Sequence, residues 1–373
     1  MKLEKAPHDF LRFCRLWALI CLIHLIVQSS LRAEATLDSR FQYYQEDDHR
    51  IRVNSVYSLF SIDLNDTTHV DGSQIYSAIS GASPTGLPPL IPGGPLPLAH
   101  LKDERNAFTL GLTKQLADHS IRVGYAYSTE SDYLSNAVSL QDTISLNQKN
   151  TDLVLSCAYT DDRVGANGTD LNAPKRTFDT LVGISQVLSP KDLLEINLSL
   201  SWSQGFLSDP YKRVLLNDFF VLADKRPSHR FEQLLFLQWT HHLPWNGASM
   251  ETSYRFGHND FGSFSHTAQI ALYQKLFQDR IVISPSLRYY WQSAANFYAT
   301  QFTGAPLYYS SDYRVSKEES YSLGVQVRWN VIRDRLAVDA GYQRYCTRGL
   351  DGVTLQAAYP KANSLSAGLH LEF

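Results

Sequence analysis

Hydrophobic and polar residues alternate along most of the chain with a period of two. From Leu194 to Ser203, apolar side chains occupy every second position, with Glu195, Asn197 and serines between them. The same alternation recurs at 121–128, 321–329 and 336–343. Successive side chains of a β-strand point to opposite faces, so the pattern predicts strands with one apolar and one polar face. After residue 35 no long apolar run and no helical stripe competes with this interpretation.

The predicted strands and their connections suit a membrane barrel. The alternating stretches run for roughly ten to fifteen residues, against about five or six for an ordinary strand. Aromatic residues flank their apolar faces, as at Trp202, Trp239, Tyr290, Trp291 and Trp329. Tight turns alternate with long polar loops, which are expected near 81–103, 162–176, 205–227, 293–316 and 347–361. Short turns at one end, long loops at the other and aromatic girdles are typical of outer-membrane barrels.

These features predict an all-β fold: a transmembrane antiparallel β-barrel of about 16 strands, with 14 to 18 also compatible. Lipid offers no hydrogen-bond partner to a backbone, so spanning strands must close into a cylinder. A soluble β-sandwich also alternates, but its apolar faces would need a second, packed sheet. The polar faces here are rich in Ser, Gly, Gln and Arg and fit a wet interior better. Residues 36–373 are expected to form this single domain.

The first 35 residues are expected to be a cleaved signal peptide. A positively charged start is followed by an apolar run from Leu16 to Val27 and by Ala33-Glu34-Ala35, an A-x-A cleavage site. The apolar run is about a dozen residues, whereas a spanning helix needs about 20. The chain is therefore predicted to be exported through the inner membrane to the outer membrane of a Gram-negative envelope.

Composition and chemistry exclude several function classes. A net charge of −3 without a dense basic block argues against nucleic acid as a partner. The adjacent histidines His241 and His242 point to opposite faces of a strand, so we expect no metal. Ser265 and His266 are adjacent in the same way, so we expect no catalytic site, no enzyme and no cofactor. The two cysteines after the signal peptide form no disulfide framework.

The chain ends on an apolar strand face. Leu369, Leu371 and Phe373 share that face, and Phe373 is the last residue. This ending resembles the C-terminal signal by which the outer-membrane barrel assembly machinery recognises its clients. We expect that machinery as a partner in biogenesis, and outer-membrane lipid and lipopolysaccharide as later partners.

Charged residues on the polar strand faces are candidates for a lumen lining. By parity they face inward, and a charge facing lipid would cost roughly 2 to 4 kcal/mol for Arg or Lys. Two interpretations stay open: a mixed-charge lumen that conducts small solutes, or a network of ion pairs that braces the interior. The candidates are Arg122, Glu195, Glu251, Arg255, Arg288, Arg328, Asp339 and His370.

Two loops could act on the mouth of such a barrel. The loop 81–103 interleaves prolines with apolar residues, and it could fold inward, present a surface to a partner, or be a mobile external loop. The loop 205–227 contains the apolar run 219–222, which is compatible with a plug or a short helix.

Several strings resemble an uncharacterised bacterial outer-membrane β-barrel family, called domain of unknown function 3570. The strings are residues 79–86 (ISGASPTG), 208–212 (SDPYK), 292–298 (QSAANFY) and 311–314 (SDYR), with 43–47 (YYQED) and 242–245 (HLPW). The resemblance covers essentially the whole mature chain and implies a barrel. It carries no catalytic residues.

The sequence thus favours a porin-like barrel that passively conducts or binds small solutes. The alternative is a structural or anchoring barrel with a plugged lumen, whose external loops bind an envelope or extracellular partner. The sequence determines neither the solute nor the oligomeric state.

Overall fold

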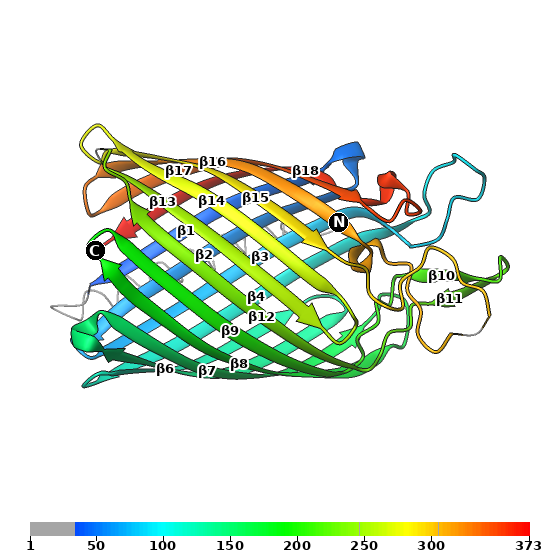
Figure 1. Ribbon diagram of the computed structural model, residues 1–373, viewed down its shortest axis with the longest axis horizontal. Helices are drawn as coiled ribbons and strands as arrows, with labels where there is room; N and C mark the ends of the chain where they lie inside the picture. The colour runs from blue at the N-terminus through cyan, green and yellow to red at the C-terminus, as the bar shows by residue number, and fades with distance from the viewer. Residues whose placement is uncertain (1–33, 246, 305) are drawn as a thin grey trace, which may run out of the picture.

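A computed structural model describes residues 34–245, 247–304 and 306–373, and these form one closed barrel (Figure 1). The closed sheet contains 16 antiparallel strands. The predicted fold class is therefore confirmed. Among the described residues no helix is long and apolar enough to cross a membrane.

The strands are long, as the alternating pattern predicted. In chain order the barrel strands are β1 (Ala35–Glu46), β2 (Ile51–Asn65), β3 (Thr68–Pro84), β4 (Leu98–Leu116), β5 (His119–Thr129), β6 (Tyr133–Leu146), β7 (Thr151–Gly165), β8 (Asn172–Ser189), β9 (Asp192–Gly205), β12 (His229–His242), β13 (Ala248–Asn259), β14 (Phe264–Leu276), β15 (Ile281–Gln292), β16 (Glu318–Ile332), β17 (Leu336–Gly349) and β18 (Lys361–Glu372). Two short strands, β10 (Arg213–Leu216) and β11 (Phe220–Ala223), form a separate hairpin.

The first and last strands close the barrel on each other. β1 pairs with β2 on one side and with β18 on the other. The backbone N–H of Phe373 donates to the carbonyl of Ala35 (2.9 Å), so the two ends of the barrel sequence lie at the same rim. A closed sheet has no free edge, which satisfies the backbone groups of every strand inside lipid.

The two faces of the wall differ as the alternation requires. Apolar side chains such as Val182, Leu198 and Leu323 are exposed on the outside. On the inside, Arg122 of β5 reaches Asp71 of β3. An apolar outer surface of this extent is stable against lipid and not against water, so the strands are the transmembrane part of the fold.

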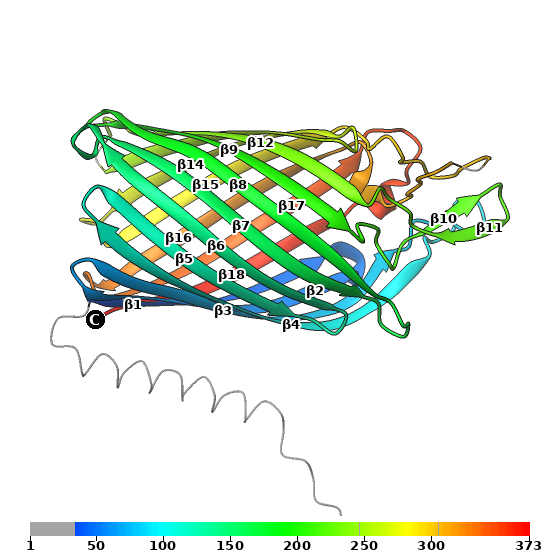
Figure 2. The ribbon, with the colours of Figure 1, turned by 90° about the horizontal axis from the view of Figure 1, so that it is seen from below.

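Short turns join the strands at the rim that holds Ala35 and Phe373, and long loops join them at the opposite rim (Figures 1 and 2). Two of the predicted loops are too long: 81–103 is reduced to 85–97, and 162–176 to 166–171. Strand pairing continues through residues that were interpreted as loop, such as Asp103 opposite Ile79. Beyond the lipid a strand can carry polar side chains on both faces, so polarity there does not mark its end. The other long loops are 206–228, 293–317 and 350–360.

The loop expected at 205–227 contains neither a plug nor a helix. Its strands β10 and β11 form a hairpin that projects away from the barrel (Figure 2). Phe219 at its tip is 85% exposed, so this end of the apolar run faces solvent and not the lumen. The run supplies one strand of a short antiparallel pair, which sequence periodicity could not distinguish from a helical turn.

The predicted signal peptide lies almost entirely outside the described residues, which begin at 34. Ala35, the expected last residue of that peptide, is the first residue of β1 and is buried.

Removing Phe373 is expected to lower the amount of folded barrel in the membrane and to leave protein in the periplasm. Phe373 ends the chain beside the strand pair that closes the barrel, and its backbone bonds Ala35. The readout is the heat-dependent gel-mobility shift in membrane and periplasmic fractions. Phe373→Tyr keeps the terminal aromatic ring and serves as the control. An unchanged yield after removal would show that the terminal residue is no assembly signal.

Candidate functional site

Four external loops join into one folded structure over the mouth of the barrel, which we call the cap: residues 85–97, 206–228, 293–317 and 350–360. The backbone N–H of Arg213 donates to Thr85 (2.7 Å), and that of Lys225 donates to Tyr309 (3.0 Å). Gly86 lies where three of these loops meet, and its φ of +96° is in the region that favours glycine. A Cβ there would collide with the carbonyl oxygens of residues 213 and 311. The cap is therefore a packed unit and not a set of independent loops.

The loop 293–317 folds into the mouth. The side chain of Gln292, at the external end of β15, donates to the carbonyl of Ser316 (2.7 Å). Tyr313 packs edge-on against Tyr359 of the loop 350–360, with ring centroids 5.6 Å apart. The segment 310–316 of this loop is therefore held in place at the external end of the barrel. Its buried residues are Ser310, Ser311, Asp312, Tyr313 and Ser316.

Ion pairs hold the centre of the cap, and we call Asp209, Asp224, Arg226, Asp312 and Arg314 the Asp312 cluster. The carboxylate of Asp312, whose side chain is 1% exposed, accepts from Arg226 (2.7 Å) and from Arg314 Nε (2.9 Å). Arg226 Nε also donates to Asp224 (2.8 Å), and Arg314 also contacts Asp209. Three carboxylates thus share two guanidinium groups. The cluster fastens the loop 206–228 to the loop 293–317.

Lys212 lies beside this cluster and is buried. Its ammonium donates to Ser83 Oγ (3.1 Å) and to the carbonyl of Pro84. The same ammonium lies 5.4 Å from the centre of the Tyr313 ring. Burial lowers the pKa of Lys212. Lys212 therefore ties the end of β3 to two loops of the cap.

The two buried aspartates of the cluster respond to their surroundings in opposite ways. Burial by itself raises the pKa of Asp312, but Arg314, Lys212 and Arg226 outweigh burial and hold this pKa below its ordinary range. Asp224 has fewer cations around it, and burial raises its pKa in spite of Arg226. Asp312 is therefore the firmly charged centre on which the cluster depends.

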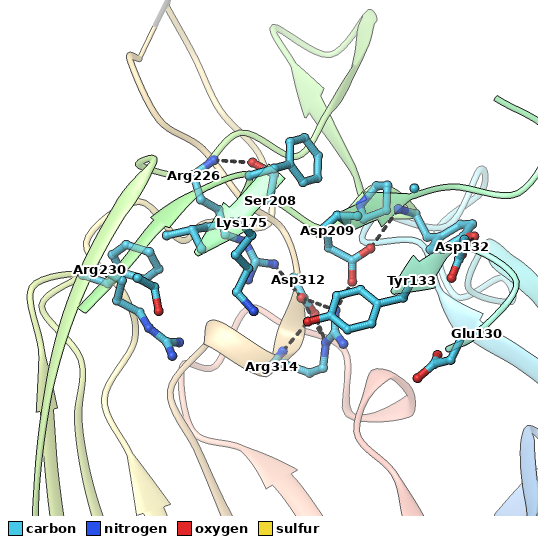
Figure 3. Close-up of a pocket in the computed structure, with 18 residues that line it drawn as sticks. Glu130, Asp132, Tyr133, Lys175, Ser208, Asp209, Arg226, Arg230, Asp312 and Arg314 are labelled. Atoms are coloured by element: carbon cyan, nitrogen blue, oxygen red, sulfur yellow. Dashed lines mark hydrogen bonds and ion pairs between the residues drawn. The ribbon is translucent and has the colours of Figure 1, made fainter. Parts of the chain in front are cut away.

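A pocket of about 670 Å³ opens beside the Asp312 cluster (Figure 3). Figure 3 shows Arg226, Arg230 and Lys175 toward one side of it, and Glu130 and Asp132 toward the other. The pocket is thus lined by charges of both signs, separated across its width. It could hold a small polar molecule that carries hydrogen-bond donors and acceptors.

Beside the acidic side of the pocket, where Glu130 and Asp132 line it, a third carboxylate, that of Asp103, lies close enough for the three to share a cation. Oxygens of Asp103, Glu130 and Asp132 lie within 4.8 Å of one another. Two of the three already accept hydrogen bonds, Asp103 from the backbone of Ser131 (3.0 Å) and Asp132 from Tyr211. Burial, followed by the charge of Asp103, raises the pKa of Glu130. Carboxylate oxygens suit a hard cation such as Ca²⁺, but these have protein partners of their own.

Three of the predicted lumen residues have partners on the inner wall. Arg122 donates to Asp71 from Nε (3.0 Å). Arg255 of β13 stacks over the ring of Phe236, 5.5 Å from its centre. Asp339 accepts from Arg40 (3.3 Å) and from Gln326 (3.1 Å).

The remaining predicted residues are distributed around the wall. Arg288 lines a cavity of about 490 Å³, and Arg328 and His370 line one of about 600 Å³ near the turns. Glu195 of β9 lies opposite Gln238, and Glu251 of β13 lies opposite Thr240. In the described strands these groups lie at separate places around the wall and do not converge on one cluster.

Sequence reasoning assigned no role to the residues that build the cap. Asp209, Lys212, Asp312 and Arg314 were placed in loops, where polar residues are expected. One signal was present, because the strings 208–212 and 311–314 both carry the family resemblance. In the structure these two strings meet, through Asp209 with Arg314 and Lys212 with Tyr313.

Comparison with known proteins gives one family and a set of barrel folds. A family model described as "Protein of unknown function (DUF3570)" matches residues 24–174 and 169–365. CdiB from Acinetobacter baumannii is similar in structure with a TM-score of 0.54 and 8% identity, over 91% of this chain and 60% of that chain. A bacterial polysaccharide outer membrane secretin has a TM-score of 0.49 and 10% identity, over 92% of this chain and 99% of that chain. OpdK from Pseudomonas aeruginosa has a TM-score of 0.45 and 8% identity, over 92% and 98%. No curated protein sequence matches the chain. At these identities the likeness extends to the fold alone, that of outer-membrane barrels.

Proposed function

The chain belongs to the family of unknown function DUF3570, and from that premise we propose that it is a passive channel for small polar solutes with a narrowed external mouth. The proposal places the barrel in the bacterial outer membrane after export by a signal peptide. Lipid and lipopolysaccharide surround its apolar wall, and the barrel assembly machinery inserts it.

The observation that carries the proposal is a series of adjoining cavities along the inner wall. A cavity of about 490 Å³ in the external half shares Gln42 with a second cavity of about 290 Å³. The second shares Arg40 with a third, of about 600 Å³, at the rim of short turns. The pocket in the cap lies at the other rim. Hollow space therefore follows the strands from the external half to the periplasmic rim, as a solute path requires.

The lining favours small polar solutes of either charge. Arg122 is paired with Asp71, and Asp339 with Arg40, so at these places the inner surface carries both signs of charge. A lumen of paired charges excludes neither cations nor anions strongly, whereas a narrowed mouth excludes by size. We expect weak charge selection and a sharp size limit.

Purified protein in planar lipid bilayers is expected to give stepwise conductance increments, smaller than those of a 16-stranded barrel with an open mouth. Folding is checked by the heat-dependent gel shift, and boiled protein is the control. Liposomes that contain the barrel should admit small sugars and retain large ones. Folded protein that gives no steps at high load would exclude the channel.

The second candidate function is an anchoring barrel, and it rests on the exposed apolar residues of the external loops. Phe219 and Phe220 at the hairpin tip are 85% and 61% exposed, and Leu90 in the loop 85–97 is 96% exposed. Exposed apolar residues so far from the lipid suit contact with an extracellular or envelope partner. In this candidate the cap closes the lumen, and the bilayer experiment gives no steps.

A further inference from the structure

Polar and small residues interrupt the apolar outer surface on β1 to β3, and we call Ser39, Ser58, Gly72 and Gln74 the polar strip. Ser39 lies opposite Ser58, and Ser58 lies opposite Gln74. On other strands the same level is filled by apolar residues, as at Leu198 of β9.

The polar strip faces outward. Side chains directly opposite each other on neighbouring strands share a face, and Gln74 lies opposite Phe108, which is 41% exposed among the outer apolar residues of β4. Asp71, three positions before Gln74, bonds Arg122 on the inner face. Gln74 therefore points to lipid.

Gln74 also lies at the depth of the hydrocarbon. Thr68, at the turn, is six positions away, and a strand tilted by about 40° with a rise of about 3.3 Å per residue gains roughly 15 Å over that length. The apolar band of such a barrel is about 25 Å tall. None of the residues that the structure describes bonds the side-chain amide of Gln74. An amide without a partner in hydrocarbon costs free energy that a partner from outside the chain would recover.

A groove runs beside this amide. Its volume is about 270 Å³, and Leu37, Phe60, Phe108 and Tyr127 line it together with Gln74. The ring of Phe60 lies over Gly72, where a Cβ would collide with it. Because Gly72 has no side chain, the outer surface of the barrel is recessed at this position. Small residues beside a polar side chain are the usual composition of protein contacts inside a membrane.

We propose that a second copy of this chain packs against the polar strip in the membrane. A primary amide both donates and accepts, so two copies of Gln74 related by a twofold axis can bond each other. The external rim above the polar strip carries both signs of charge, because Arg52, Lys102 and Glu104 all lie on the same outward face. The positive groups of one copy can therefore lie against the negative group of the other. A lipid acyl chain could fill the groove, but it would leave the amide without a partner.

The test uses cysteine cross-linking in intact outer membranes. Cys157 and Cys346 are replaced by serine, and Gln74→Cys is introduced; treatment with a thiol cross-linker is expected to convert most of the protein to a covalent dimer. Ile270→Cys on β14, seven strands away around the barrel and six positions from its own turn, is the matched control and is expected to stay monomeric. A monomer at position 74, or equal cross-linking at both positions, would overturn the proposal.

A second measurement separates a copy of the chain from lipid. Barrels are extracted with their surrounding lipid into polymer-bounded discs, and their molar mass is measured by light scattering. The wild type is expected to be dimeric, and Gln74→Leu is expected to shift at least half of it to monomer, with the gel shift confirming that it is folded. A monomeric wild type would assign the groove to lipid. A Gln74→Leu protein that remains fully dimeric would show that the amide does not hold the copies together.

Discussion

Replacing Asp312 by alanine is expected to open the cap and to raise the single-channel conductance several-fold, while the barrel stays closed. The carboxylate of Asp312 is nearly inaccessible, and it pairs with Arg226, whose side chain is 12% exposed. Removal of one partner of a buried ion pair costs about 3 to 5 kcal/mol, because the other charge remains without compensation. The loops 206–228 and 293–317 would lose their common centre, and the segment 310–316 would leave the mouth.

The cost falls on the cap because the barrel strands contribute no side chain to the Asp312 cluster. The gel shift should therefore be unchanged, and protease should cut the loop 293–317 faster. Asp170→Ala changes an exposed aspartate in a loop outside the cap and is the matched control. An Asp312→Ala protein with the conductance of the wild type would show that the cluster does not hold the mouth narrow.

The barrel could be predicted because the alternation of apolar and polar residues that produces it is local and recurs in every strand. Leu323, Val325 and Trp329 face lipid, while Gln326 and Arg328 between them face the lumen, and the same rule applies to every strand. Lipid permits no other solution for an alternating chain, because each backbone group needs a neighbouring strand. The strand count follows from the spacing of turns, which a two-residue period makes visible.

The cap was not predictable because its contacts are neither local nor periodic. Asp312 and Arg226 lie 86 positions apart and meet only after the barrel has fixed the ends of their loops. Lys212 illustrates the difficulty, since a lysine in a polar loop is expected in solvent and this one is buried. The sequence allowed the loop 81–103 to fold inward, but it presents Leu90 to solvent, and the segment 310–316 of another loop is the buried one.

Acid is expected to open the cap of the wild type only below about pH 4, the ordinary pKa range of an aspartate. The pKa of Asp312 is lower in the capped state than in an open state, because its cations outweigh its burial. Its contribution to the cap is therefore present above the ordinary pKa and is lost as the pH falls toward the lower value. Asp224 acts in the opposite direction: burial raises its pKa, so the capped state takes up that proton first, and this uptake favours the cap as the pH falls. No opening should therefore occur between pH 7 and about pH 5.

The measurement is single-channel conductance from pH 7 to pH 3, with the gel shift recorded at each pH to show that the barrel persists. The wild type should remain in its low-conductance state until about pH 4 and then rise. Asp312→Asn has no carboxylate to protonate at this position, so its conductance should be high at neutral pH and nearly constant below it. An opening midpoint near pH 6 in the wild type would contradict this account. Loss of the charge on Asp312 at that pH would require a raised pKa, and the surrounding cations lower the pKa of Asp312.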